Sequence, residues 1–275
     1  MSHDSLAFIG GGQMARAIVA GLLAGGHPAA SIRVADPSAA QRESLLRDFP
    51  GIAVHPGNAA AADGAATWVL AVKPQQMAEA CAGLAALAAR QRPLVISVAA
   101  GVRLADLARW LGPDTPLVRS MPNRPAFVRA GIAALVAGPA AGPAERQRAN
   151  RLLAAVGACE WLEDEALMDA VTAVSGSGPA YAFLLIEMLE AAAIAEGLPA
   201  ASARRLAVET VHGAARMARE LGEEPATLRG QVTSAGGTTA AALAVLEAAG
   251  IRATFARAVH AARLRSAELA EGTGR

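Results

Sequence analysis

The chain has 275 residues, of which 53% are hydrophobic, and its formal net charge at pH 7 is +1. A chain of this length and hydrophobic content can bury a sizeable core, which excludes a disordered protein and predicts two domains. The balanced charge provides no basic surface for nucleic acid or for an anionic membrane. We therefore expect its partners to be small molecules or further subunits.

Cysteine use and the apolar stretches indicate the compartment. Cys81 and Cys159 are too few for a disulfide framework, and neither has a second cysteine or a histidine at metal-ligand spacing. No basic leader precedes the first apolar run, and Glu187, Glu190 and Glu196 interrupt the most apolar later stretch. We expect a cytoplasmic protein without a metal site or a membrane-spanning segment.

Alternating strands and helices are predicted for the first part of the chain. Short apolar runs predict the strands, and helix-forming segments separate them. The strands are expected at 6–9, 31–35, 67–72, 94–99, 116–119 and 132–136, and the helices at 13–24, 37–49 and 75–89. This order is typical of a mainly parallel sheet with right-handed crossovers.

The strand pattern ends after about Glu163, and helix formers then dominate as far as Leu269. Only short glycine- and proline-containing segments interrupt them, among them SGSGP, in which Pro179 predicts a kink in a long helix at least as readily as a binding feature. We expect an α/β fold: a Rossmann-type dinucleotide-binding domain over residues 1–163 followed by an all-helical domain over residues 164–275.

A glycine-rich turn lies between the first strand and the first helix. In FIGGGQMARA, Gly10, Gly12 and Ala15 form the pattern G-x-G-x-x-A. The first glycine permits a tight turn, the second lets the backbone approach a pyrophosphate, and the small third residue lets helix and strand pack closely. Such turns also occur for structural reasons alone, but the strand–turn–helix context favours a dinucleotide, whose phosphates would meet the helix N-terminus.

Asp36 ends the second predicted strand, where an acidic side chain accepts hydrogen bonds from the adenosine ribose of NAD. Ser38, Arg33 and Arg42 are close enough in sequence to accommodate the 2′-phosphate of NADP instead. The sequence leaves the choice between NADPH and NADH open.

Two further segments follow predicted strands. Lys73, in LAVKPQ, is the only lysine among 25 basic residues, and it lies at the edge where open α/β sheets bind ligands. An ordinary surface lysine is the alternative. Asn123, in SMPNRPA, offers an amide between two prolines that fix the backbone, although this motif could also be a rigid turn.

Two features of the helical part remain. The segment QVTSAGGTT (231–239) places four hydroxyls and two glycines between predicted helices, more hydrogen-bonding groups than a simple connector needs. The segment 180–195 is apolar on nearly every face, so it should be covered on all sides, most simply by a second copy of itself.

The chain resembles the pyrroline-5-carboxylate reductase family in five segments that occur in order along almost its whole length: FIGGGQMARAI, LAVKPQ, MPNRPA, DAVTAVSGSGPAYAF and QVTSAGGTT. It departs from the family at Ala235, where proline is usual, and at Arg124, where threonine is usual. The first departure should loosen the loop slightly, and the second adds a charge near the cofactor edge.

The resemblance implies hydride transfer from NADPH or NADH to the C=N carbon of 1-pyrroline-5-carboxylate, giving L-proline. It implies that backbone N–H groups and hydroxyls at Ser234, Gly236, Gly237 and Thr238 hold the carboxylate and that Thr239 reaches the ring nitrogen. Glu165 matches a family position near the substrate but could equally belong to a solvated acidic patch. The expected cofactor contacts are Gly10, Gly11, Gly12, Gln13, Met14, Ala15, Asp36, Asn58, Ala71, Val72, Lys73, Pro74, Ala99, Met121 and Asn123.

The resemblance also implies at least a homodimer, in which interlocked helical domains bring the late loop of one chain to the nicotinamide of the other. Two alternatives compete with this function. A 3-hydroxyacid dehydrogenase-like enzyme or another imine reductase has a similar layout, but the segment 169–183 holds no lysine. A redox-sensing protein would bind the dinucleotide without turnover.

Overall fold

The structure is a computed structural model, and it describes residues 4–273. The chain divides into two compact units, one formed by Met1–Gly176 with Ala262–Arg275 and the other by Ser177–Ala261. We call them the sheet unit and the helical unit. This division differs from the single boundary expected after residue 163. Residues 164–176 and the end of the last helix pack with the sheet unit.

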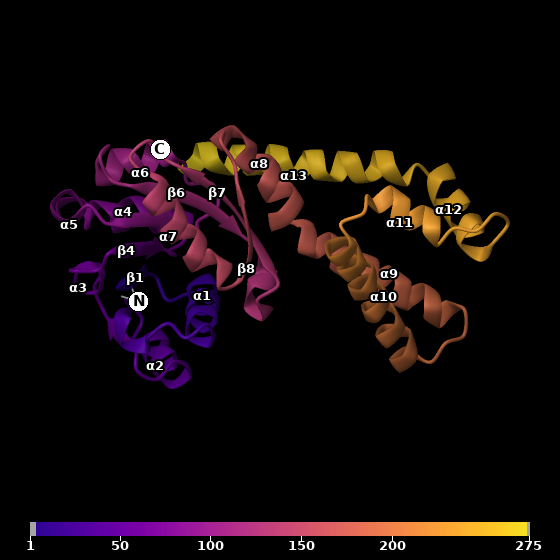
Figure 1. The fold of residues 1–275 in the computed structure, drawn as a ribbon, viewed down its shortest axis with the longest axis horizontal. Coiled ribbons are helices and arrows are strands. Elements are labelled where there is room, and N and C mark those ends of the chain that lie inside the picture. Colours follow the sequence, from indigo (N-terminus) through magenta and orange to yellow (C-terminus); the bar gives the residue numbers. More distant parts are fainter. Residues whose placement is uncertain (1–3, 274–275) are drawn as a thin grey trace. The chain divides into compact units, whose positions relative to one another are not determined.

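An eight-stranded sheet forms the centre of the sheet unit (Figure 1), in the order β3-β2-β1-β4-β5-β6-β7-β8. β1 to β6 run parallel, β7 is antiparallel to β6, and β8 is parallel to β7. The strands are β1 (Leu6–Ile9), β2 (Ile32–Ala35), β3 (Ala53–His55), β4 (Thr67–Leu70), β5 (Leu94–Ser97), β6 (Leu117–Pro122), β7 (Gly131–Ala137) and β8 (Gly157–Trp161). The expected Rossmann-type α/β architecture is confirmed.

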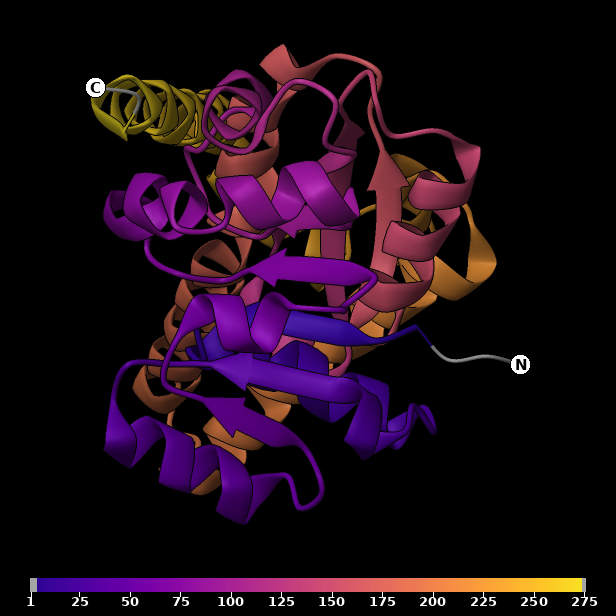
Figure 2. The ribbon, with the colours of Figure 1, turned by 90° about the vertical axis from the view of Figure 1, so that its left-hand side faces the viewer.

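Helices lie on either side of this sheet (Figure 2), so both of its faces are buried. Side chains alternate along β1, with Phe8 in one core cluster and Ile9 in the other. The first core contains residues of α1 (Gln13–Ala24), α2 (Ala39–Asp48) and α7 (Pro143–Ala154). The second contains residues of α3 (Asn58–Ala62), α4 (Met77–Ala82), α5 (Ala85–Gln91) and α6 (Leu104–Leu111).

Several details of the sheet unit differ from the sequence prediction, which also did not include α3, α6 and α7. The helix expected at 75–89 is broken into a 3₁₀ turn, α4 and α5, with a break at Gly83 and Leu84. The short strand β3 was not predicted. β8 was not predicted either, because its residues are only half-buried or exposed and give no continuous apolar run.

The segment that follows β8 is irregular. It consists of a 3₁₀ turn η4 (Glu165–Leu167), the short helix α8 (Met168–Val171) and a π-helical turn η5 (Thr172–Gly176). Pro179 does not kink a helix, as the sequence indicated, but occupies the first turn of the next one. Proline fits there because the first N–H groups of a helix have no intrahelical partner.

The helical unit is built from α9 (Gly178–Ala195), α10 (Ala200–Leu221), α11 (Pro225–Gln231), α12 (Thr238–Ala248) and the first part of α13 (Ile251–Thr273). α9 packs along α10 (Figure 1), yet within the described chain no residue of α9 is buried. By length and composition alone, the stretch Glu165–Ala195 is long and apolar enough to cross a membrane, a test that a core or interface helix can also pass.

Candidate active site

The expected cofactor residues of the sheet unit lie at the carboxyl ends of parallel strands. β1 stands between β2 and β4, so the chain crosses to opposite sides of β1 and creates the crevice in which such sheets bind dinucleotides. Gly10 to Ala15 follow β1, Asp36 follows β2, and Ala71 to Pro74 follow β4. Asn58 begins α3 after β3, Ala99 follows β5, Met121 is within β6, and Asn123 follows β6.

The three glycines of the turn have different structural causes. Gly10 has φ +98°, and a Cβ there would lie 2.8 Å from the Ala71 carbonyl oxygen. A Cβ at Gly11 would lie 2.6 Å from Leu45 Cδ1. Gly12 has ordinary extended backbone, φ −69° and ψ −175°, and a Cβ would meet only the Ala71 carbonyl, at 4.0 Å. The protein's own packing therefore requires no glycine at position 12, which fits the approach of a pyrophosphate.

Asp36 connects the end of β2 to this turn. Its Oδ2 accepts a hydrogen bond from Gly11 N at 3.0 Å, and its Oδ1 accepts one from Ser38 N at 2.9 Å. Arg42 donates to the carbonyl oxygens of Asp36 and Pro37 at 2.8 and 2.9 Å. Arg33 donates instead to the carbonyl of Asp63. Asp36 and Arg42 thus border the expected adenosine end, whereas Arg33 is committed elsewhere.

The residues after β4 and β5 form the middle of this edge. Lys73 is exposed and precedes the 3₁₀ turn that Pro74 begins, so its ammonium is available to an anion. Ala99 is buried, and its N–H donates a long hydrogen bond of 3.4 Å to Ser97 Oγ. The residues here are small or apolar apart from Lys73, which lets a flat ligand lie close to the backbone.

Asn123 is used by the protein itself. Its Oδ1 accepts from Ile132 N at 2.9 Å, and its Nδ2 donates to the Ser175 carbonyl at 3.0 Å. Ser175 lies four residues before Pro179, which has no N–H to donate to that carbonyl in a regular helix. The Asn123 amide supplies the donor that Pro179 lacks, so this residue is a structural link as well as an expected cofactor contact.

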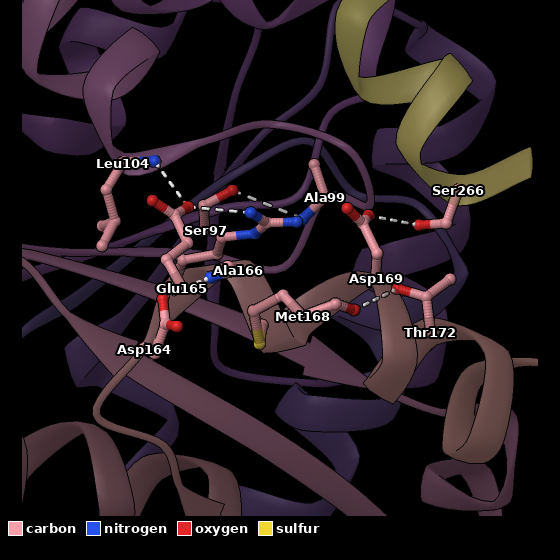
Figure 3. Close-up of polar contacts among 11 residues, drawn as sticks. Ser97, Ala99, Leu104, Asp164, Glu165, Ala166, Met168, Asp169, Thr172 and Ser266 are labelled. Atoms are coloured by element: carbon pink, nitrogen blue, oxygen red, sulfur yellow. Dashed lines mark hydrogen bonds and ion pairs between the residues drawn. The ribbon is translucent and has the colours of Figure 1, made fainter. Parts of the chain in front are cut away.

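Glu165 does not belong to a solvated acidic patch. Its Oε1 accepts from Leu104 N at 2.9 Å and from Arg119 Nη1 at 2.8 Å, and the Arg119 side chain is only 5% exposed. Figure 3 shows this carboxylate beside the start of α6. Arg119 was not predicted as a site residue, because the only signal for it in the sequence is a charged residue at the end of an apolar strand. Whether Glu165 also contacts substrate stays a prediction.

The late loop is a tight turn that leads into α12. Gly237 N donates to the Ser234 carbonyl at 3.1 Å, and Gly236 has φ +70°. A Cβ at Gly237 would meet the rotatable Ser234 Oγ, so the positive φ makes Gly236 the position of this turn that favours glycine. Thr238 and Thr239 form the first turn of α12, whose N–H groups are free to bind an anion. The five expected substrate residues of this loop therefore do lie together.

No group of histidine, cysteine or carboxylate side chains in the described residues could hold a metal ion. The thiol of Cys81 is buried, and burial raises its pKa to about 12, so it remains protonated at neutral pH.

Comparison with protein families identifies two regions of the chain. Residues 5–101 match the family model described as NADP oxidoreductase, coenzyme F420-dependent. Residues 165–269 match the model for pyrroline-5-carboxylate reductase dimerisation. The first match contains the glycine turn, and the second contains α9 and the late loop, which agrees with a homo-oligomer formed through the helical part.

Whole-chain comparisons agree with the family models. The chain is 47% identical to the pyrroline-5-carboxylate reductase of Pseudomonas aeruginosa over all of both chains, and 44% identical to that of Synechocystis over 96% of this chain and 97% of the other. The Coxiella burnetii pyrroline-5-carboxylate reductase structure superposes with a TM-score of 0.93, at 40% identity and with coverage of 98% and 99% of the two chains. On these grounds the chain belongs to the pyrroline-5-carboxylate reductase family.

Proposed function

We propose that this protein reduces 1-pyrroline-5-carboxylate to L-proline with NADPH or NADH, the last step of proline biosynthesis. The observation that carries the proposal is the glycine turn, where Gly12 leaves open space that no packing constraint of the protein explains. A related structure from Plasmodium falciparum, 26% identical with a TM-score of 0.85, is described with NADP bound.

The sheet unit would hold the cofactor. The backbone from Gly10 to Ala15 and the N-terminus of α1 would receive the pyrophosphate, and Asp36 with Arg42 would border the adenosine ribose. Lys73 would approach a phosphate or ribose, and the small residues around Ala99 would leave room for the nicotinamide. When bound, the reduced nicotinamide supplies a hydride to the C=N carbon, while the ring nitrogen carries the proton of the amine product.

The late loop would hold the substrate. The N–H groups at the start of α12, with the hydroxyls of Ser234 and Thr238, would bind the carboxylate, and Gly236 and Gly237 would let the backbone close around it. The Thr239 hydroxyl would hydrogen-bond the ring nitrogen and orient the C=N bond toward the nicotinamide. This reaction requires no nucleophile, since a protonated imine accepts hydride directly.

The active form would be at least a homodimer in which the glycine turn of one chain and the late loop of another complete each site. It would be a cytoplasmic protein with neither a nucleic acid nor a membrane as partner. The apolar surface of α9, with Phe183 56% exposed and Met188 51% exposed, supports a partner copy as its cover.

The direct test follows NADPH absorbance after addition of pyrroline-5-carboxylate, with NADH in parallel. We expect rapid loss of absorbance and formation of proline. Cofactor binding without turnover would support a redox sensor instead, and turnover of a 3-hydroxyacid in place of the imine would support the dehydrogenase alternative. The ratio of kcat/KM values for the two cofactors would settle the preference that the sequence leaves open.

Mixing two inactive variants tests the shared site. A Gly12→Val chain exchanged with a Thr239→Val chain should regain activity, because half of the sites in a mixed dimer would combine two intact contributions. Sites built within single chains would regain none. A fully active monomer in light scattering would also contradict the shared site.

A further inference from the structure

The loop between β5 and α6, residues 98–103, borders the expected nicotinamide position through Ala99. Its beginning is held by Ser97, whose Oγ accepts from Ala99 N and whose carbonyl accepts from Ser120 Oγ at 2.9 Å. Gly101, in the middle of the loop, has φ +77°. The contacts of this loop with its neighbours therefore bear on the position of Ala99.

Glu165 supports the end of this loop. Leu104 is the first residue of α6, and its N–H is one of those that a helix leaves without an internal acceptor. Glu165 Oε1 accepts a hydrogen bond from this N–H and, at the same time, one from Arg119 Nη1. Arg119 lies on β6, the strand next to β5 in the sheet. The buried guanidinium therefore fixes the carboxylate that fixes the helix start.

The same segment also supports the middle of the loop. One helical turn after Glu165, Asp169 Oδ1 accepts from Ser266 Oγ of α13 at 2.7 Å (Figure 3). A Cβ at Gly101 would lie 3.5 Å from Ala270 Cα, so the end of α13 lies directly against the loop. The segment 165–171 thus connects to the loop along two routes, through α6 and through α13.

From these contacts we infer that Glu165 is a positioning residue, which with Arg119 holds the loop 98–103 and through it Ala99 at the nicotinamide. This inference rests on the proposed function for its effect on turnover, but not for its effect on the loop. It assigns Glu165 a role that acts through the protein, and it makes Arg119, which carries no reacting group, part of the same device.

The test compares Glu165→Gln and Glu165→Ala with Glu163→Gln as the matched control. Glu163 is two residues away, but its side chain is 84% exposed and pairs with Arg146 only at 3.4 Å. Hydrogen exchange without any ligand should show faster exchange at Leu104 and in residues 98–103, most in the alanine variant, less in the glutamine variant, and unchanged in the control. The glutamine variant should lose less protection from exchange, because its amide oxygen can still accept a hydrogen bond from Leu104 N.

Kinetics then separate positioning from substrate contact. We expect kcat to fall about tenfold in Glu165→Gln, since small displacements of a reacting group are costly, while KM for the imine changes less than about twofold. Arg119→Lys should lower kcat similarly, and the double variant should lose little more than either single one. If Arg119→Lys does not fold, the hydrogen exchange of Glu165→Ala still decides.

Two results would overturn the inference. One is unchanged exchange at Leu104 and in the loop of Glu165→Ala. The other is a Glu165→Gln enzyme whose KM for the imine rises while kcat is kept, as expected for a residue that binds substrate. Failure of wild-type protein to reduce the imine would instead contradict the proposed function, and the exchange experiment would remain valid.

Discussion

The sheet unit and the helical unit bury their apolar residues in different ways. In the sheet unit, both faces of the sheet are covered by the chain's own helices, and side chains such as Phe8 and Trp68 are completely buried. In the helical unit, α9 has no buried residue in the described chain, and Leu185 is 44% exposed. The first unit therefore has a core of its own, whereas the second exposes the kind of surface that forms cores.

This difference explains a sequence pattern that would otherwise be ambiguous. A helix that is apolar on nearly every face belongs in a membrane, in a large core or in an interface. Since the dimerisation model of the family matches residues 165–269, the interface is the reading that agrees with all observations. The stability of the helical unit should then depend on protein concentration, whereas the stability of the sheet unit should be independent of it.

The largest effect is expected from a charge on α9. In Leu185→Glu a carboxylate would have to be buried against a partner, at a cost of several kcal/mol, so association should weaken by at least about a hundredfold. Light scattering should show smaller species, and the activity should fall with them. The matched control is Leu46→Glu on α2, since Leu46 is 46% exposed but belongs to the sheet unit.

The Leu46→Glu protein should keep both assembly and melting temperature. If both variants weaken association to the same extent, an exposed apolar side chain has no special role in the helical unit, and the contrast between the two units would be wrong. If Leu185→Glu assembles as well as wild type, the cover of α9 lies elsewhere.

The next effect should be confined to the cofactor. Gly12→Val should still fold, because the nearest protein atom to a Cβ there is 4.0 Å away, but the side chain would occupy the space of the pyrophosphate. We expect the Kd for NADPH to rise by about tenfold or more in a fluorescence titration, with a melting temperature lowered only as far as replacing the N-cap glycine of α1 requires. Gly12→Ala should give a smaller effect of the same sign. Unchanged affinity in the valine variant would remove the assignment of the turn.

A third effect should be confined to turnover. Thr239→Val is nearly isosteric but lacks the hydroxyl, and loss of one well-placed donor costs on the order of a hundredfold in rate, about 3 kcal/mol. We expect kcat to fall by this factor while the Kd for NADPH stays within about twofold. Thr238→Val next to it removes a hydroxyl expected at the carboxylate instead, so it should raise KM for the imine more than it lowers kcat. A wild-type kcat in Thr239→Val would exclude a role at the ring nitrogen.

The sequence predicted the elements whose signals are local. The strand before Gly10, the helix from Gln13 to Ala24 and the change to helices all follow from apolar runs and glycine positions, and the structure confirms them. β8 was missed because an edge strand that is half exposed has no continuous apolar signal. Its place in the sheet is set by pairing with β7, which a single sequence does not reveal.

The same limit applies to the site. Residues of the glycine turn were predicted because their spacing, G-x-G-x-x-A between a strand and a helix, is a local sequence pattern. The partners of Glu165 could not be predicted, since Arg119 and Leu104 are brought to it only by the folded sheet and are 46 and 61 residues away in the chain. The hydrogen bonds of Asn123 to Ser175 and Ile132, and of Asp36 to Gly11, could not be predicted for the same reason. Long-range hydrogen bonds to side chains are the part of a site that sequence patterns do not contain.

The smallest effect concerns a departure from the family within the late loop. The turn from Ser234 to Gly237 has the pattern of a type II turn. Its second residue, Ala235, has a negative φ, and its third residue, Gly236, has φ +70°. Proline is favoured at the second position of such turns, and the hydrogen bond that closes the turn does not use the N–H of Ala235. Ala235→Pro should therefore stabilise the protein by about 0.4 to 1 kcal/mol by restricting the unfolded chain, and Ala235→Gly should destabilise it by a similar amount. Thermal melting at fixed concentration measures both changes in stability.

Because the two substitutions act mainly through the unfolded state, stability changes of opposite sign would show that the loop is already formed in this chain without the proline. A loss of stability in both variants would contradict a type II turn at Ser234–Gly237.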